Sequence, residues 1–197
     1  MIMDYATNTI QVKIVYYGCA MSGKTTSLRY IFRYFNKEEE LTSIETTTGR
    51  TLFFDFGALE FAGNTWNVKI MLYSATGQDF YASTRPATLH GVDGIVFVVD
   101  SQQEFLEDNL RSWNELCHYF SPRLTSIPVV VCFNKWDLRN KIEPDEFLEK
   151  IPGNEEELTT VKTVACTGQG VLEAFDMAVH KVLGISLLGS LQQHQEN

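Results

Sequence analysis

Eight residues near the beginning of the chain constrain its fold more than any other segment. Residues 18–25, GCAMSGKT, match the pattern G-x-x-x-x-G-K-[ST] at every specified position. An apolar run, residues 12–17, precedes them, and a helical pattern over residues 24–35 follows. Between a strand and a helix, glycines let backbone N–H groups surround phosphate oxygens, and the helix N-terminus adds positive potential. The segment is therefore predicted to be a phosphate-binding loop.

Individual residues of this loop have expected roles. Lys24 is predicted to contact the β- and γ-phosphates of a nucleotide and to act in catalysis, and Thr25 to place its hydroxyl on Mg²⁺. Further contacts with the nucleotide are expected within the loop and just after it, at Gly18, Ala20, Met21, Ser22, Gly23 and Thr26.

Strands and helices are expected to alternate along the chain. Apolar runs predict six strands, at residues 12–17, 51–56, 68–73, 94–99, 128–133 and 161–165, and helical patterns lie at 24–35, 104–120, 144–150 and 171–183. This order predicts an α/β fold of the three-layer P-loop NTPase type, with a mostly parallel sheet between two layers of helices. Residues 57–67 predict a hairpin, which makes one edge strand antiparallel. Ligands of such sheets bind at the carboxyl ends of the strands.

Composition limits the kinds of molecule that the chain is expected to bind. The chain has 197 residues, a length typical of one domain. Its formal net charge of −9 argues against nucleic-acid binding, which depends on clustered Lys and Arg. No apolar run approaches the roughly 18 residues of an integral membrane segment. The cysteines form no C-x-x-C pair, so a reduced protein in the cytoplasm is expected.

A second motif, at residues 134–137, predicts which base is bound. The sequence NKWD follows the apolar run at 128–133. The Asp137 carboxylate can accept hydrogen bonds from N1–H and the exocyclic amine of guanine, whereas adenine offers neither and leaves the carboxylate unpaired. Lys135 is expected to lay its stem along the base, and Asn134 to connect neighbouring loops. A further base contact is predicted at Ala165 and Cys166, with the Ala165 N–H facing the guanine O6.

Four further segments carry a family resemblance: residues 13–18 (KIVYYG), 23–26 (GKTT), 50–56 (RTLFFDF) and 91–98 (GVDGIVFV). With the two motifs above, they resemble the Ras-like small GTPases, and more closely the bacterial and archaeal branch typified by the gliding-motility GTPase MglA. The resemblance covers about residues 11–183. It implies a single Ras-like G domain over residues 1–197, with residues 185–197 as a candidate C-terminal tail, that binds GTP or GDP with Mg²⁺.

The resemblance also assigns the segment before the second strand. Thr46, Thr47, Thr48 and Thr51 compete for one role, in which a hydroxyl binds Mg²⁺ and an N–H contacts the γ-phosphate. Similarity to the MglA branch selects Thr51. In that branch an arginine at the position of Arg50 acts as an arginine finger within the same chain, an effect worth roughly 10³–10⁵ in rate. A surface arginine without a role is the alternative.

Residues 74–78, SATGQ, stand where most Ras-like proteins have D-x-x-G-Q. Gly77 is expected to offer its N–H to the γ-phosphate, since glycine alone allows so close an approach, and Gln78 to orient the attacking water. Ser74 replaces the usual Asp, and Asp55 on the neighbouring strand, or a water held by Ser74, is expected to compensate. Ala20 stands where Ras-like proteins usually have Gly, and its methyl group either crowds the γ-phosphate or is harmless.

Arg50 and Thr51 join the strand at 51–56 without any intervening residue. A switch that withdraws them after hydrolysis should pull the strand with it. A slip of two residues keeps each side chain on its face of the sheet, whereas a slip of one inverts them. A two-residue register change between the GDP and GTP forms is therefore predicted.

Two functions remain after these arguments. The first is a GTPase switch that hydrolyses GTP slowly without an activating partner. The second is a nucleotide-dependent adaptor with little or no hydrolysis, which Ala20 and Ser74 favour and which Arg50 and Gln78 oppose. The resemblance implies a roadblock-type GTPase-activating protein, an unknown effector and a role in cell polarity or motility.

Overall fold

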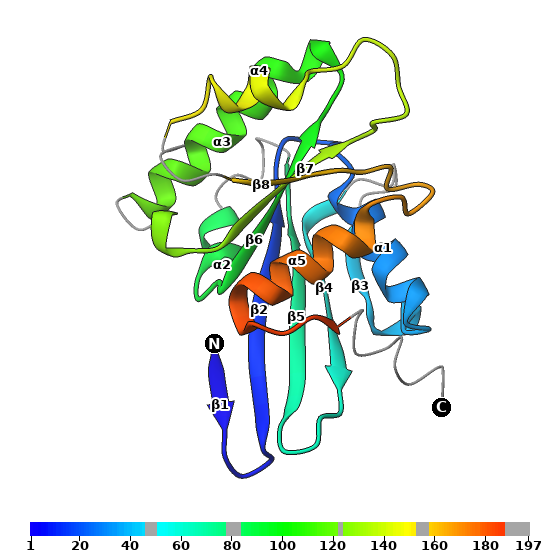
Figure 1. The fold of residues 1–197 in the computed structure, drawn as a ribbon, viewed down its shortest axis with the longest axis vertical. Coiled ribbons are helices and arrows are strands. Elements are labelled where there is room, and N and C mark those ends of the chain that lie inside the picture. The colour runs from blue at the N-terminus through cyan, green and yellow to red at the C-terminus, as the bar shows by residue number, and fades with distance from the viewer. Residues whose placement is uncertain (46–50, 78–83, 122–123, 153–157, 188–197) are drawn as a thin grey trace.

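The computed structural model describes residues 1–45, 51–77, 84–121, 124–152 and 158–187. Arg50 and Gln78, both predicted to act in catalysis, lie outside the described residues, as do Thr46, Thr47 and Thr48. A β-sheet occupies the middle of the molecule, and helices pack on both of its faces (Figure 1).

The sheet has eight strands within the described part of the chain, in the order β3-β4-β5-β2-β6-β7-β8, with β1 paired to β2 outside this path. Its strands are β1 Ile2–Asp4, β2 Thr9–Tyr17, β3 Thr42–Glu45, β4 Thr51–Phe61, β5 Asn67–Ala75, β6 Gly94–Asp100, β7 Val129–Asn134 and β8 Thr159–Lys162. The central strand β2 runs parallel to β5 and β6, and β6, β7 and β8 continue in parallel. The antiparallel pairs are β1 with β2, β3 with β4 and β4 with β5.

The predicted fold class is confirmed, including the mainly parallel sheet and a strand, β4, that is antiparallel to β5. This strand is not at the edge as predicted, because β3 pairs with its outer side, and β1 is a second antiparallel strand. The predicted number of six strands is wrong, because β1 and β3 were not expected. These strands have 3 and 4 residues, too few for an alternating pattern to be recognised in the sequence. The hairpin predicted at residues 57–67 joins β4 to β5, but both strands extend into it, so that the connection is only residues 62–66.

Within the described parts of the chain, two helices cover one face of the sheet and three cover the other. On the first face lie α1 (Lys24–Tyr34) and α5 (Val171–Leu183), and on the second α2 (Arg85–Leu89), α3 (Leu106–Phe120) and α4 (Pro144–Leu148). Single 3₁₀ turns occupy Glu38–Glu40, Gln103–Phe105 and Leu124–Ser126. The bounds of α5 are those predicted, whereas the short α2 was not expected.

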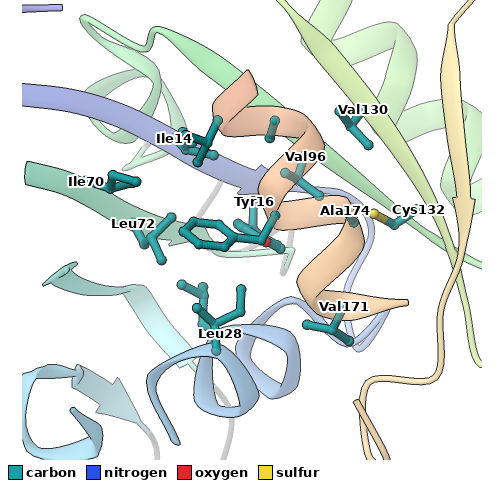
Figure 2. Packing of buried hydrophobic residues seen from close by; sticks show 14 of the residues in the cluster. Ile14, Tyr16, Leu28, Ile70, Leu72, Val96, Val130, Cys132, Val171 and Ala174 are labelled. Carbon is teal, nitrogen blue, oxygen red and sulfur yellow. The ribbon is translucent and has the colours of Figure 1, made fainter. Parts of the chain in front are cut away.

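The alternation of side chains along β2 explains the two cores. Ile14 and Tyr16 point toward α1 and α5, while Val15 and Tyr17 point to the opposite core with α3 and α4. Figure 2 shows the first core, where strand residues meet Leu28 of α1 and Ala174 of α5. Burial on both faces fixes the register of the central strands, and therefore the position of the loops at their ends.

The chain folds back after α5. Gly184, at φ 71°, ends the helix, because a left-handed residue is favoured there. Leu187 then enters the core between α1 and α5, and the Asp176 carboxylate accepts hydrogen bonds from Leu187 N and Ser186 Oγ, both at 2.6 Å. No helix in the described ranges combines the length and the apolarity that crossing a bilayer requires.

Candidate functional site

The loops that carry the sequence motifs meet at one end of the sheet, where the parallel strands have their carboxyl ends. The parallel strands β2, β5, β6, β7 and β8 end there, and their carboxyl ends lead into residues 18–23, 76–77, 101–102, 135–137 and 163–167. Residues that are far apart in the sequence therefore surround one place, as the position of binding sites in this class of sheet requires.

The phosphate loop has the backbone that its pattern predicts. Gly23 precedes α1 with φ 107°, and a Cβ on it would lie 2.0 Å from Asn134 Nδ2, so no larger residue fits without displacing that side chain. Gly18 and Ser22 are buried, whereas Met21 and Thr26 face solvent. The inner side of the loop, with its glycines, thus packs against Asn134, whereas its outer side is exposed to solvent.

Lys24 lies inside this loop. Its Nζ donates hydrogen bonds to the carbonyls of Gly18 at 2.9 Å and Cys19 at 2.6 Å, and its side chain is buried. Burial lowers the pKa of Lys24 to about 8. An ammonium group in this position is partly desolvated and surrounded by weak acceptors, and phosphate oxygens would stabilise its charge much better.

Next to the loop, oxygen ligands suited to Mg²⁺ lie together. The Thr25 hydroxyl donates a hydrogen bond to the Asp55 carboxylate, which is 0% exposed. Asp55 pairs directly with Ser74 across β4 and β5, so the carboxylate that Ser74 lacks is present one strand away. Among the residues that the structure describes, no group of three His, Cys, Asp or Glu could hold a metal by itself. Hydroxyl and carboxylate oxygens that are completed by phosphate oxygens fit Mg²⁺, which is usually bound in this way.

Gly77 lies against the phosphate loop. A Cβ on it would be 2.5 Å from Ala20 N and 2.6 Å from the Cys19 carbonyl carbon, both backbone atoms that cannot move away cheaply. Only glycine therefore fits at this position, and its neighbour is the backbone of the loop at Ala20. Thr51 begins β4 and pairs with Glu45 of β3.

Asn134 connects the loops, as predicted. Its Nδ2 donates to Ser22 O of the phosphate loop at 2.7 Å, and its Oδ1 accepts from Ala165 N at 2.9 Å and from Thr163 Oγ1 at 3.2 Å. The side chain is 2% exposed. The predicted phosphate-binding and base-binding segments are thus joined through one buried amide.

The loop after β7 presents the other residues of NKWD. Lys135 has φ 62°, and its Nζ pairs with the fully buried Asp100 carboxylate, while Asp137 is exposed at the rim. Cys166 is also exposed, after the buried Ala165. The Ala165 N–H, predicted to face the guanine O6, donates to Asn134 Oδ1 at 2.9 Å in this structure.

Some residues of the site could not be recognised from the sequence. Trp136 has Lys141 Nζ and Lys162 Nζ each 4.3 Å from its ring centre, and Lys141 also donates to its carbonyl at 2.9 Å. These contacts fix the turn that presents Asp137. The role of Asp100 was not predicted from the sequence either. Its position at the end of a buried strand was the signal that could have indicated it.

A sheet of this topology with a phosphate loop after β2 and N-K-x-D after β7 defines a P-loop guanine-nucleotide-binding domain. A model of the Ras family matches residues 13–184, and the chain belongs to that family. The mutual gliding-motility protein MglA of Myxococcus xanthus is 37% identical over 187 residues, which cover 92% of this chain and 95% of the relative. The Ras-related proteins Rab-27B of Rattus norvegicus and Rab-4A of Bos taurus are each 26% identical, over 87% of this chain and 79% and 74% of their own length.

Proposed function

We propose that this protein is a GTPase switch: it binds GTP with Mg²⁺, hydrolyses it to GDP and phosphate, and engages partners according to which nucleotide is bound. The observation that carries the proposal is the buried Asn134, whose hydrogen bonds join the phosphate loop to Ala165. The segments that would bind the base, through Asp137, and the triphosphate, through residues 18–26, are therefore connected to each other. Gly77 belongs to the same connected site, because it contacts the loop at Ala20.

The phosphates and the metal have separate partners. Lys24 would exchange its carbonyl acceptors for the β- and γ-phosphate oxygens, and backbone N–H groups of the loop would surround them. When bound, Mg²⁺ neutralises charge on the same oxygens. Thr25 and Thr51 are proposed to hold it, with Asp55 supplying the nearby carboxylate that Ser74 lacks. The buried bond from Thr25 to Asp55 supports this assignment.

Hydrolysis is proposed to use Gln78 and Arg50. Gln78 would orient a water that attacks the γ-phosphorus as the bond to the β,γ-bridging oxygen breaks, and Arg50 would neutralise the charge of the transferring group. Gly77 N–H would contact a γ-phosphate oxygen. Such switches hydrolyse GTP at about 10⁻⁴ to 10⁻² per second alone, so an activating partner is expected to set the rate.

Single-turnover hydrolysis tests this proposal against a nucleotide-dependent adaptor. The parent, Gln78→Leu and Arg50→Ala are loaded with GTP and Mg²⁺, and released phosphate is measured. We expect both variants to retain GTP binding, Arg50→Ala to lose about 10³-fold in rate, and Gln78→Leu to release phosphate more slowly than the parent. A parent that releases no phosphate, with or without cell extract, would favour the adaptor, with Ala20 and Ser74 as its basis.

Partners and location follow from similarity and remain proposals. The relative MglA is named for gliding motility, and a comparable role in polarity or motility is proposed for this protein. A roadblock-type GTPase-activating protein and an effector specific to one nucleotide state are the expected partners, and the cytoplasm is the expected location. Affinity capture with GDP-loaded and GTP-loaded protein would identify partners of each state.

A further inference from the structure

A buried arginine behind Gly77 has no part in the function proposed so far. Arg85 opens α2, and its side chain is only 6% exposed. Its Nε donates to Thr76 O at 2.9 Å, and its Nη1 pairs with the Glu115 carboxylate of α3. A planar guanidinium that bonds two groups at once has little freedom to turn. Arg85 therefore connects the Thr76 carbonyl to α3.

The Thr76 carbonyl controls a second group. Thr76 O and Gly77 N–H belong to one peptide unit, which is planar and, in its trans form, directs the two groups to opposite sides. A partner that fixes the carbonyl therefore also fixes the direction of the N–H. In the proposed function, this N–H contacts the γ-phosphate.

The anchor of this connection is rigid. Glu115 lies between Trp113 and Leu116, which are 1% and 0% exposed, and its other carboxylate oxygen accepts a hydrogen bond from Tyr119 at 3.1 Å. The helix α3, whose Trp113 and Leu116 lie in the core, thus holds the far end of the Arg85 bridge.

The space beside the peptide would allow it to turn. A cavity of about 210 Å³ is lined by Gly77, Arg85 and Glu115 together with Cys19 and Ala20 of the phosphate loop. Arg85 therefore borders the same cavity as Cys19 and Ala20 of the phosphate loop.

We propose that Arg85 is a positioning residue for GTP: by tying the Thr76 carbonyl to Glu115, it aims the Gly77 N–H at the γ-phosphate. This inference rests on the proposed function. GDP has no γ-phosphate, so the Arg85 bridge contributes to the affinity for GTP and not to the affinity for GDP. A residue that only stabilises the fold would affect both nucleotides alike.

Dissociation constants for GDP and for a non-hydrolysable GTP analogue, both with Mg²⁺, test the proposal. The variants are Arg85→Met and the double variant Arg85→Met/Glu115→Met. The double variant keeps the volume and leaves no buried charge unpaired, so it retains the fold even where the single variant does not. Arg33→Gln is the control, because it removes an exposed arginine that pairs with Glu38 far from the site.

We expect the double variant to bind the analogue about tenfold more weakly, the loss of one hydrogen bond to a charged group, and GDP within about twofold of the parent. Unchanged affinity for both nucleotides, or an equal loss for both, would overturn the role of Arg85 alone. A parent that binds neither guanosine nucleotide would overturn the proposed function, and this inference with it.

Discussion

At the scale of single residues, a bound nucleotide is expected to change the charge of Lys24. Its pKa is lowered to about 8 by burial, so the free protein begins to lose this charge just above neutral pH. Phosphate oxygens favour the charged form, and binding above pH 8 must therefore take up a proton. We expect the affinity for GDP to be nearly constant below the pKa of Lys24 and to fall about tenfold between pH 7 and pH 9. Titration calorimetry at several pH values measures this.

A control variant separates this effect from other titrations. Lys24→Met removes the titrating group, so its affinity for GDP should be low at all pH values and should lose the tenfold change. The same slope in the variant and in the parent would show that a group other than Lys24 takes up the proton.

A substitution of Asp55 tests the proposed Mg²⁺ site. Asp55→Asn keeps an acceptor for the Thr25 hydroxyl but removes the buried negative charge beside it. Because groups that support metal ligands typically contribute 10–100-fold to metal affinity, the Mg²⁺ concentration needed to retain GTP should rise about tenfold or more. Nucleotide release measured over a range of Mg²⁺ concentrations gives this value. Asp145→Asn, an exposed change on α4, should behave as the parent.

Among the elements, β4 has a feature that bears on switching. Ser43 of β3 pairs with Asp55 and Glu45 pairs with Thr51, so two steps along β3 match four along β4. The surplus of two residues lies in β4 between Thr51 and Asp55. It equals the slip that keeps side chains on their faces of the sheet, and it supports the predicted register change of β4 between nucleotide states.

Hydrogen exchange with residue resolution tests that register change. Amides of β4 that are protected in the GDP form should differ from those protected with a GTP analogue, whereas β6 and β7, buried on both faces, should exchange alike in the two states. Identical protection of β4 in both states would contradict a register change.

At the scale of strands and helices, some features could be predicted from the sequence and others could not. The phosphate loop, the position of β7 before NKWD and the role of Asn134 were predictable, because each depends on local pattern and on the hydrogen-bonding groups of one side chain. The bridge from Arg85 to Glu115 and the contacts of Lys141 and Lys162 with Trp136 were not. They depend on how α2, α3 and β8 pack, and no local spacing records that.

In the molecule as a whole, Asn134 holds the two halves of the site together. Asn134→Ala would leave Ser22 O and Ala165 N without their buried partner, which should lower the free energy of unfolding by about 2–4 kcal/mol. For a domain of this size that is a fall in melting temperature of about 4–16 °C. Asn114→Ala on the exposed side of α3 is the matched control, with a change near zero. Thermal unfolding without nucleotide measures both, and a melting temperature equal to the parent would contradict the role of Asn134.

Recognition of guanine by Asp137 is the claim on which the whole account depends. The most direct test is calorimetric titration of the nucleotide-free protein with GDP and with ADP, in the parent and in Asp137→Ala. We expect the parent to bind GDP roughly 10⁴-fold or more tightly than ADP, since adenine leaves the carboxylate unpaired, and Asp137→Ala to lose most of that preference. Equal affinity of the parent for GDP and ADP would contradict the account.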